Sequence, residues 1–110
     1  MAALFVGCIY HWGQGVAVDY PRAMAAYKVA AEAGDALSQW QVGGMYYNGL
    51  GVLQDNVMAH MWNNIGAANG NELGGTNRDK IAKKMTSADI SKAQQMAREC
   101  MSSGYKKCGY

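Results

Sequence analysis

The sequence repeats itself at an interval of 36 residues, and this periodicity limits the fold more than any other feature. Eleven of the 37 residue pairs from Met1/Leu37 to Leu37/Leu73 are identical, where composition alone would give roughly three. The identical pairs contain eight of the fourteen glycines, and the chain has only one proline, which excludes a collagen-like or low-complexity chain. A period of this length is typical of supersecondary units that stack and bury a shared core.

Each unit is predicted to contain two helices. The first, or A helix, spans about 2–11 and again 38–47, where apolar and small residues recur at a spacing of three and four. The second, or B helix, spans about 20–33 and 56–69, with Asp19 and Asp55 as N-caps. Gly7 and Gly43 lie inside the A helices, which predicts the close approach of a neighbouring helix. The other repeated glycines, at positions 13, 15, 34, 49, 51 and 70, are predicted to form the turns.

The repeat weakens after Gly70, but the helical pattern continues. Residues 72–85 form a helical segment, and a last helix is expected at 87–102, with Thr86 and Asp89 at capping-box spacing. We therefore predict an all-α, single repeat domain. It consists of one unit at about 2–35, a second at about 38–70, a degenerate third repeat or C-terminal cap at about 71–102, and a tail at 103–110.

The repeated residues resemble a known family. The pattern Val-Gly-x-x-Tyr-x-x-Gly-x-Gly-Val-x-x-Asp-x-x-x-Ala, at 6–23 and 42–59, is similar to the Sel-one-like repeat, a relative of the tetratricopeptide repeat. The second copy departs from the first where Gly66 stands in the place of Ala30. The resemblance implies an α-α superhelix of antiparallel helix pairs. It also implies a non-enzymatic module that binds other proteins, without a cofactor.

The same resemblance selects groove residues on the A helices. In the first unit these are Leu4, Cys8, His11 and Trp12, in the second Trp40, Gly44, Tyr47 and Asn48, and in the third Thr76, Lys80, Lys83 and Lys84. The groove would be aromatic at one end and basic at the other, which favours a protein or peptide partner with an apolar part and acidic residues or a C-terminal carboxylate. Two alternatives stay open. The three lysines could form a solvated capping face, and Trp40 could belong to the core.

Catalysis is a competing hypothesis with little support in the sequence. Cys8 and His11 stand three residues apart on one helix, the spacing at which an imidazole could activate a thiol in a hydrolase. No third orienting group, phosphate-binding loop or nucleophile elbow accompanies them. His11 and His60 lie in different helices without other ligands at metal-binding spacing, so no metal site is predicted.

A third hypothesis is self-association. The chain begins within the A helix of its first unit, where Leu4, Phe5 and Ile9 would expose apolar surface. We expect this end to pack in a homodimer. The alternative is that the chain is a fragment of a longer array.

The cysteines bear on the cellular compartment. Cys100 is expected in the last turn of the final helix and Cys108 follows eight residues later, so a folded-back tail could bring them into a disulfide. A disulfide would indicate a periplasmic or secreted protein, whereas reduced thiols would indicate the cytoplasm. Cys8 is left over in either case.

Charge and hydropathy exclude two further classes of partner. Residues 1–71 carry a net charge of −2 and residues 72–110 a net charge of +4. No nucleic-acid motif or base-stacking platform accompanies the basic end, so nucleic-acid binding is not expected. Polar residues interrupt both uncharged stretches, at 1–18 and 36–54, so membrane insertion is not expected either.

Overall fold

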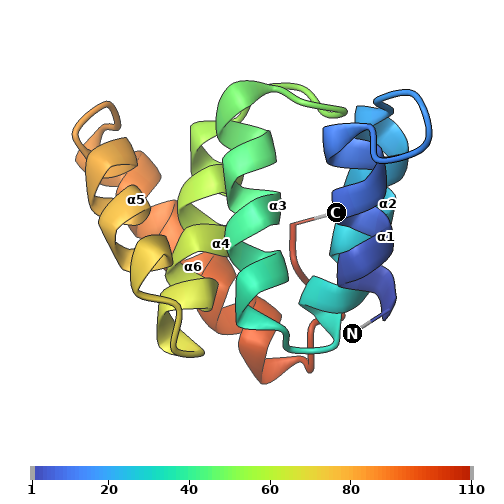
Figure 1. The fold of residues 1–110 in the computed structure, drawn as a ribbon. Coiled ribbons are helices and arrows are strands. Elements are labelled where there is room, and N and C mark those ends of the chain that lie inside the picture. The colour runs from blue at the N-terminus through green and yellow to red at the C-terminus, as the bar shows by residue number, and fades with distance from the viewer. Residues whose placement is uncertain (1, 110) are drawn as a thin grey trace.

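The computed structural model describes residues 2–109, and six helices account for most of them. They are α1 (Ala2–Trp12), α2 (Tyr20–Glu32), α3 (Ala36–Asn48), α4 (Asn56–Ala68), α5 (Glu72–Ala82) and α6 (Ser87–Ser102). Figure 1 shows α1, α3 and α5 as one layer and α2, α4 and α6 as the layer behind it. The described residues contain no strand, and the all-α helical-repeat fold expected from the sequence is confirmed.

Side-chain caps fix where the helices begin. The carboxylates of Asp19 and Asp55 accept hydrogen bonds from the backbone N–H groups of Arg22 and Met58, each at 3.1 Å, as predicted. Asp35 caps α3 in the same way, and for this reason α3 begins at Ala36, two residues before the expected start.

The helix expected at 72–85, by contrast, is shorter than the sequence suggests. It ends at Ala82, and residues 83–85 form a turn in which the N–H groups of Lys84 and Met85 donate to the carbonyls of Ile81 and Ala82. The B helices likewise end one residue early, at Glu32 and Ala68, before the positive-φ glycines 34 and 70.

The predicted close approach at the A-helix glycines is present. A Cβ atom at Gly7 would lie 2.5 Å from the ring of Tyr27, and one at Gly43 would lie 2.8 Å from Cγ of Asn63. Each A helix therefore contacts its own B helix at a distance that only glycine permits. Tyr27 and Asn63 are themselves 36 residues apart, so the two contacts are the same contact in successive units.

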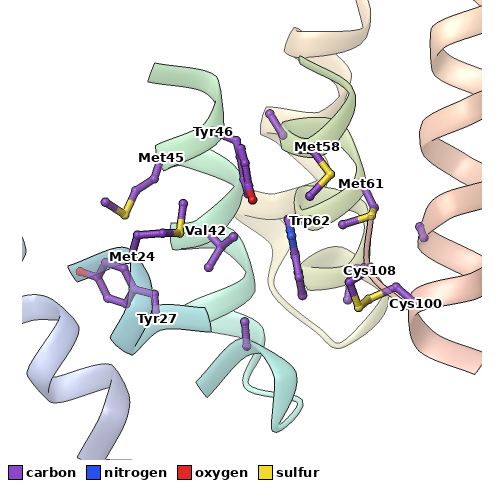
Figure 2. Packing of buried hydrophobic residues seen from close by; sticks show 14 of the residues in the cluster. Met24, Tyr27, Val42, Met45, Tyr46, Met58, Met61, Trp62, Cys100 and Cys108 are labelled. Atoms are coloured by element: carbon purple, nitrogen blue, oxygen red, sulfur yellow. A yellow bond between two sulfur atoms is a disulfide. The ribbon is translucent and has the colours of Figure 1, made fainter. Parts of the chain in front are cut away.

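The core runs along the interface between the two layers. Figure 2 shows it extending from Met24 and Tyr27 of α2, through Val42 and Met45 of α3, to Trp62 of α4. Trp62 is the largest fully buried side chain. The disulfide between Cys100 and Cys108 closes the cluster at its C-terminal end and holds the tail against α6.

Candidate functional site

Two adjoining hollows lie on the face formed by the A helices. The first, which we call the aromatic hollow, has a volume of ≈ 300 Å³ and is lined by His11, Trp12, Trp40, Gln41, Gly44, Met45, Asn48, Leu50 and Asn77. The second, the amide hollow, has a volume of ≈ 270 Å³ and is lined by Gly44, Tyr47, Asn48, Asn63, Asn77, Lys80 and Ile81. Gly44, Asn48 and Asn77 line both, so the two hollows form one continuous surface across α1, α3 and α5.

Seven of the twelve predicted groove residues line these hollows: His11, Trp12, Trp40, Gly44, Tyr47, Asn48 and Lys80. Trp40 is half-buried on this surface, and Trp12 is 64% exposed. Lys84 lies at the rim, where its ammonium group donates a hydrogen bond to the Tyr47 hydroxyl and stands 5.1 Å from the centre of that ring.

Four other predicted residues do not line the hollows, among them Thr76, whose hydroxyl donates to the carbonyl of Glu72. Leu4 packs against the core, and the exposed Lys83 is the C-cap of α5. Cys8 is half-buried and contacts Tyr27 of the B helix. Leu4 and Cys8 occupy the helix positions expected of groove residues, but the Tyr27 side chain fills the space next to Cys8.

The Tyr27 hydroxyl stands between the two residues of the catalytic hypothesis. It donates to Sγ of Cys8 at 3.7 Å and lies 3.0 Å from Nδ1 of His11, from which it can accept. Burial raises the pKa of Tyr27 well above its usual range and lowers the pKa of His11. Within residues 2–109 no hydrogen bond joins Cys8 to His11 directly, so the thiol lacks the adjacent base that a nucleophile of this kind uses.

Sequence reasoning missed three polar residues of the hollows. Gln41 and Asn77 are the equivalents of Phe5 in the second and third units. They directly follow the predicted groove residues Trp40 and Thr76, and both line the hollows. Asn63 comes from the B helix α4, which the groove pattern did not include. The 36-residue period offered a signal for all three, because polar residues stand there in place of Phe5 and Tyr27 of the first unit.

Neither a metal-binding cluster nor a membrane-crossing helix occurs in the part of the chain that the structure describes. Residues 2–109 bring together no group of three histidine, cysteine or acidic side chains able to hold a metal ion. Within the same residues, no helix combines the length and apolar character needed to cross a bilayer.

Comparison with known proteins identifies the family. A sequence model described as the Sel1 repeat matches residues 1–35 and 36–71. The chain belongs to the Sel1 repeat family. The repeats of this family generally serve as protein-interaction scaffolds and are typically non-enzymatic, which agrees with the hollowed A-helix face.

Solved Sel1-repeat structures share the fold. A protective antigen present in uropathogenic Escherichia coli strains, which displays an SLR fold, superposes with a TM-score of 0.88 at 30% identity, over 94% of this chain and 23% of its own. A Sel1 repeat protein from Oxalobacter formigenes gives a TM-score of 0.69 at 34% identity, over 72% of this chain and 59% of its own. The chain thus spans about a quarter of the antigen's length. No curated protein matches the sequence significantly.

Proposed function

We propose that the chain binds an extended segment of a partner protein along the A-helix face, across the aromatic and amide hollows. The observation that carries this proposal is the continuity of the two hollows, which share Gly44, Asn48 and Asn77. A single small ligand would occupy one hollow, whereas an extended peptide, which advances about 3.3 Å per residue, passes through both.

The side chains around the hollows favour a partner with two chemically different parts. At one end the indole of Trp12 stacks on the His11 ring with centroids 4.4 Å apart, and Trp40 stands beside them. Aromatic groups of this kind bind apolar and aromatic side chains. At the other end Lys80 and Lys84 offer ammonium groups to an acidic side chain or a C-terminal carboxylate.

Gly44 provides the test, because it lies on the wall that both hollows share. A Cβ atom built there meets no heavy atom within 4 Å, so Gly44→Leu should fill the hollows without displacing a helix. The matched control is Ala25→Leu, on an exposed position of α2. Short random peptides displayed on phage would be selected against the wild-type protein and their affinities measured by calorimetry. We expect Gly44→Leu to lose the selected peptides and Ala25→Leu to retain them. Equal binding by both variants would refute the proposed groove.

A second candidate function, self-association, is favoured by exposed apolar residues on the first helix pair. Phe5 is 67% exposed on α1, and Val29 is 64% exposed on α2. Exposed apolar side chains of this size that gather on neighbouring elements mark interaction surfaces. We therefore keep the proposal that a second copy of the chain packs against this end.

We also propose that the protein works in an oxidising compartment, a periplasm or an extracellular space. The support is the buried position of Cys100 and Cys108, which are bonded to each other in the core.

A further inference from the structure

The amide hollow exists because one position of the repeat carries a shorter side chain in the second unit. In the first unit Tyr27 reaches past Gly7 and places its hydroxyl between Cys8 and His11. The equivalent of Tyr27 in the second unit is Asn63, which packs against Gly43.

A second, smaller residue widens the same space. Gly44 takes the place of Cys8, whereas Tyr47, which takes the place of His11, is the larger residue of that pair. The volume that the Tyr27 phenol fills in the first unit is therefore open in the second, and both Asn63 and Gly44 line it.

Asn63 presents a hydrogen-bond acceptor there that has no partner. Its Nδ2 donates to the carbonyl of Ala59 at 2.9 Å, which fixes the orientation of the carboxamide. The residue is 0% exposed, and its buried Oδ1 accepts no hydrogen bond within the described chain. Buried polar atoms are nearly always paired, so an orphaned acceptor on a residue that lines a hollow is a candidate to accept from a bound donor.

The aromatic hollow contains the complementary group. Nε1 of Trp40 is buried and donates to no acceptor within residues 2–109. Asn77, on the wall common to both hollows, adds a neutral carboxamide between them. The floor of the continuous surface thus offers an unpaired acceptor in one hollow and an unpaired donor in the other, and neither carries a charge.

We propose that this floor binds the main chain of the partner segment, with Oδ1 of Asn63 accepting from a peptide N–H and Nε1 of Trp40 donating to a peptide carbonyl. The inference rests on the proposed function and names the chemistry of its ligand. An extended main chain brings both kinds of group to successive positions, whereas one amide side chain would supply them in a single hollow. Gly44 fits this role, since the absence of a side chain lets a backbone approach closely.

When the protein binds the main chain of the partner, the affinity depends little on the amino-acid sequence of the partner segment. Asn63 and Trp40 would hold any extended segment, and the rim residues, Trp12 and Lys80, would choose among segments by their side chains. Peptides selected on the wild-type protein should therefore differ in sequence and share a requirement for one particular unmodified amide.

The experiment combines variants of the protein with N-methylated peptides. Phage-selected peptides that bind the wild-type protein would be N-methylated at each amide in turn, and their affinities measured for the wild type, Asn63→Leu and Trp40→Phe. We expect N-methylation of one amide to weaken binding to the wild type about tenfold. The same methyl group should have little further effect on Asn63→Leu, because the acceptor it blocks is already gone.

The possible outcomes separate this inference from the proposed function. Peptides that are lost by Gly44→Leu but bind Asn63→Leu and Trp40→Phe at wild-type affinity would overturn main-chain recognition and leave the groove standing. Peptides that tolerate N-methylation at every amide would do the same. If Gly44→Leu binds like the wild type, or no peptide is selected, the proposed groove fails and this inference fails with it. Should Asn63→Leu not fold, as judged by circular dichroism, the N-methyl series on the wild type and Trp40→Phe still decides.

Discussion

Two adjacent glycines in α3 should respond in opposite directions to the same substitution. A Cβ atom at Gly43 would lie 2.8 Å from Cγ and 3.1 Å from the backbone nitrogen of Asn63, so α3 and α4 would have to move apart. A Cβ atom at Gly44, one residue later, meets nothing within 4 Å. Both residues lie inside the helix, so replacement by alanine changes the helix propensity at each position by about the same amount.

The difference between the two variants therefore isolates the effect of packing. Alanine in place of a helical glycine stabilises by about 0.5–1 kcal/mol. Gly44→Ala should gain this amount in the free energy of unfolding. Gly43→Ala gains the same amount but also overpacks the α3–α4 contact, which costs about 1–3 kcal/mol. The two variants should thus differ by about 1–3 kcal/mol, or roughly 4–12 °C in Tm for a domain of this size.

Thermal and urea denaturation followed by far-UV circular dichroism would measure this difference. The glycine pair of α5 provides an internal repeat of the experiment, since a Cβ atom at Gly74 would lie 2.6 Å from the carbonyl oxygen of Asn63, whereas one at Gly75 would make ordinary contacts at 3.6 Å or more. Gly74→Ala should therefore behave like Gly43→Ala, and Gly75→Ala like Gly44→Ala. If Gly43→Ala proved as stable as Gly44→Ala, the close approach of the helices would not explain the glycine.

Four further outcomes are expected. Burial, and to a smaller extent Arg78, lower the pKa of His60. The free energy of unfolding should therefore be fully present above a pH of about 6.5 and decline as the pH falls below it. His60→Leu should flatten this decline in calorimetric scans. Cys108→Ser should lower the free energy of unfolding by about 2–3 kcal/mol through loss of the loop closure, a difference that reductant should reproduce in the wild type alone. Lys80→Ala should weaken binding of acidic peptides about two- to fivefold at low salt, while Lys83→Ala, outside the hollows, should leave it unchanged in calorimetry. Phe5→Glu should shift a concentration series in light scattering towards monomer, and a wild type that is monomeric at every concentration would end the dimer proposal.

The backbone of this protein could be predicted from its sequence to within a few residues, because the repeat carries the signals that fix it. Asp19 and its copy Asp55 mark where the B helices begin, and Gly7 and Gly43 mark where the helices touch. The expected and observed bounds differ at the start of α3. This helix begins two residues before the expected position because the carboxylate of Asp35 accepts from the N–H of Ser38, and the repeat pattern does not mark that cap.

The candidate site was predictable only in part, because it depends on side chains from different helices. The helix phase selects Trp40 and Lys80, and both line the hollows of the A-helix face. The same phase selected Cys8, and it could not reveal that the Tyr27 side chain crosses from the B helix to fill the space beside it. Whether a position is hollow depends on the length of the residue that faces it, and periodicity within one helix carries no information about that length.

Three departures of the second unit from the first make a side chain smaller at or near the hollow. Gly44 replaces Cys8, Asn63 replaces Tyr27 and Gly66 replaces Ala30, so the side chain becomes smaller at each position. Gly66 also brings α4 close to the start of α3, since a Cβ atom there would lie 3.3 Å from the carbonyl oxygen of Ala36 and 3.4 Å from the nitrogen of Trp40. The changes at Gly44 and Asn63 open the amide hollow. The change at Gly66 lets α4 pack closely against the turn of α3 that carries Trp40. Three of the positions at which the two units differ, Trp40, Gly44 and Asn63, line the surface proposed to bind the partner. For a repeat protein of this kind, the differences between equivalent positions of successive units therefore point more directly to the binding surface than the shared residues that identify the fold.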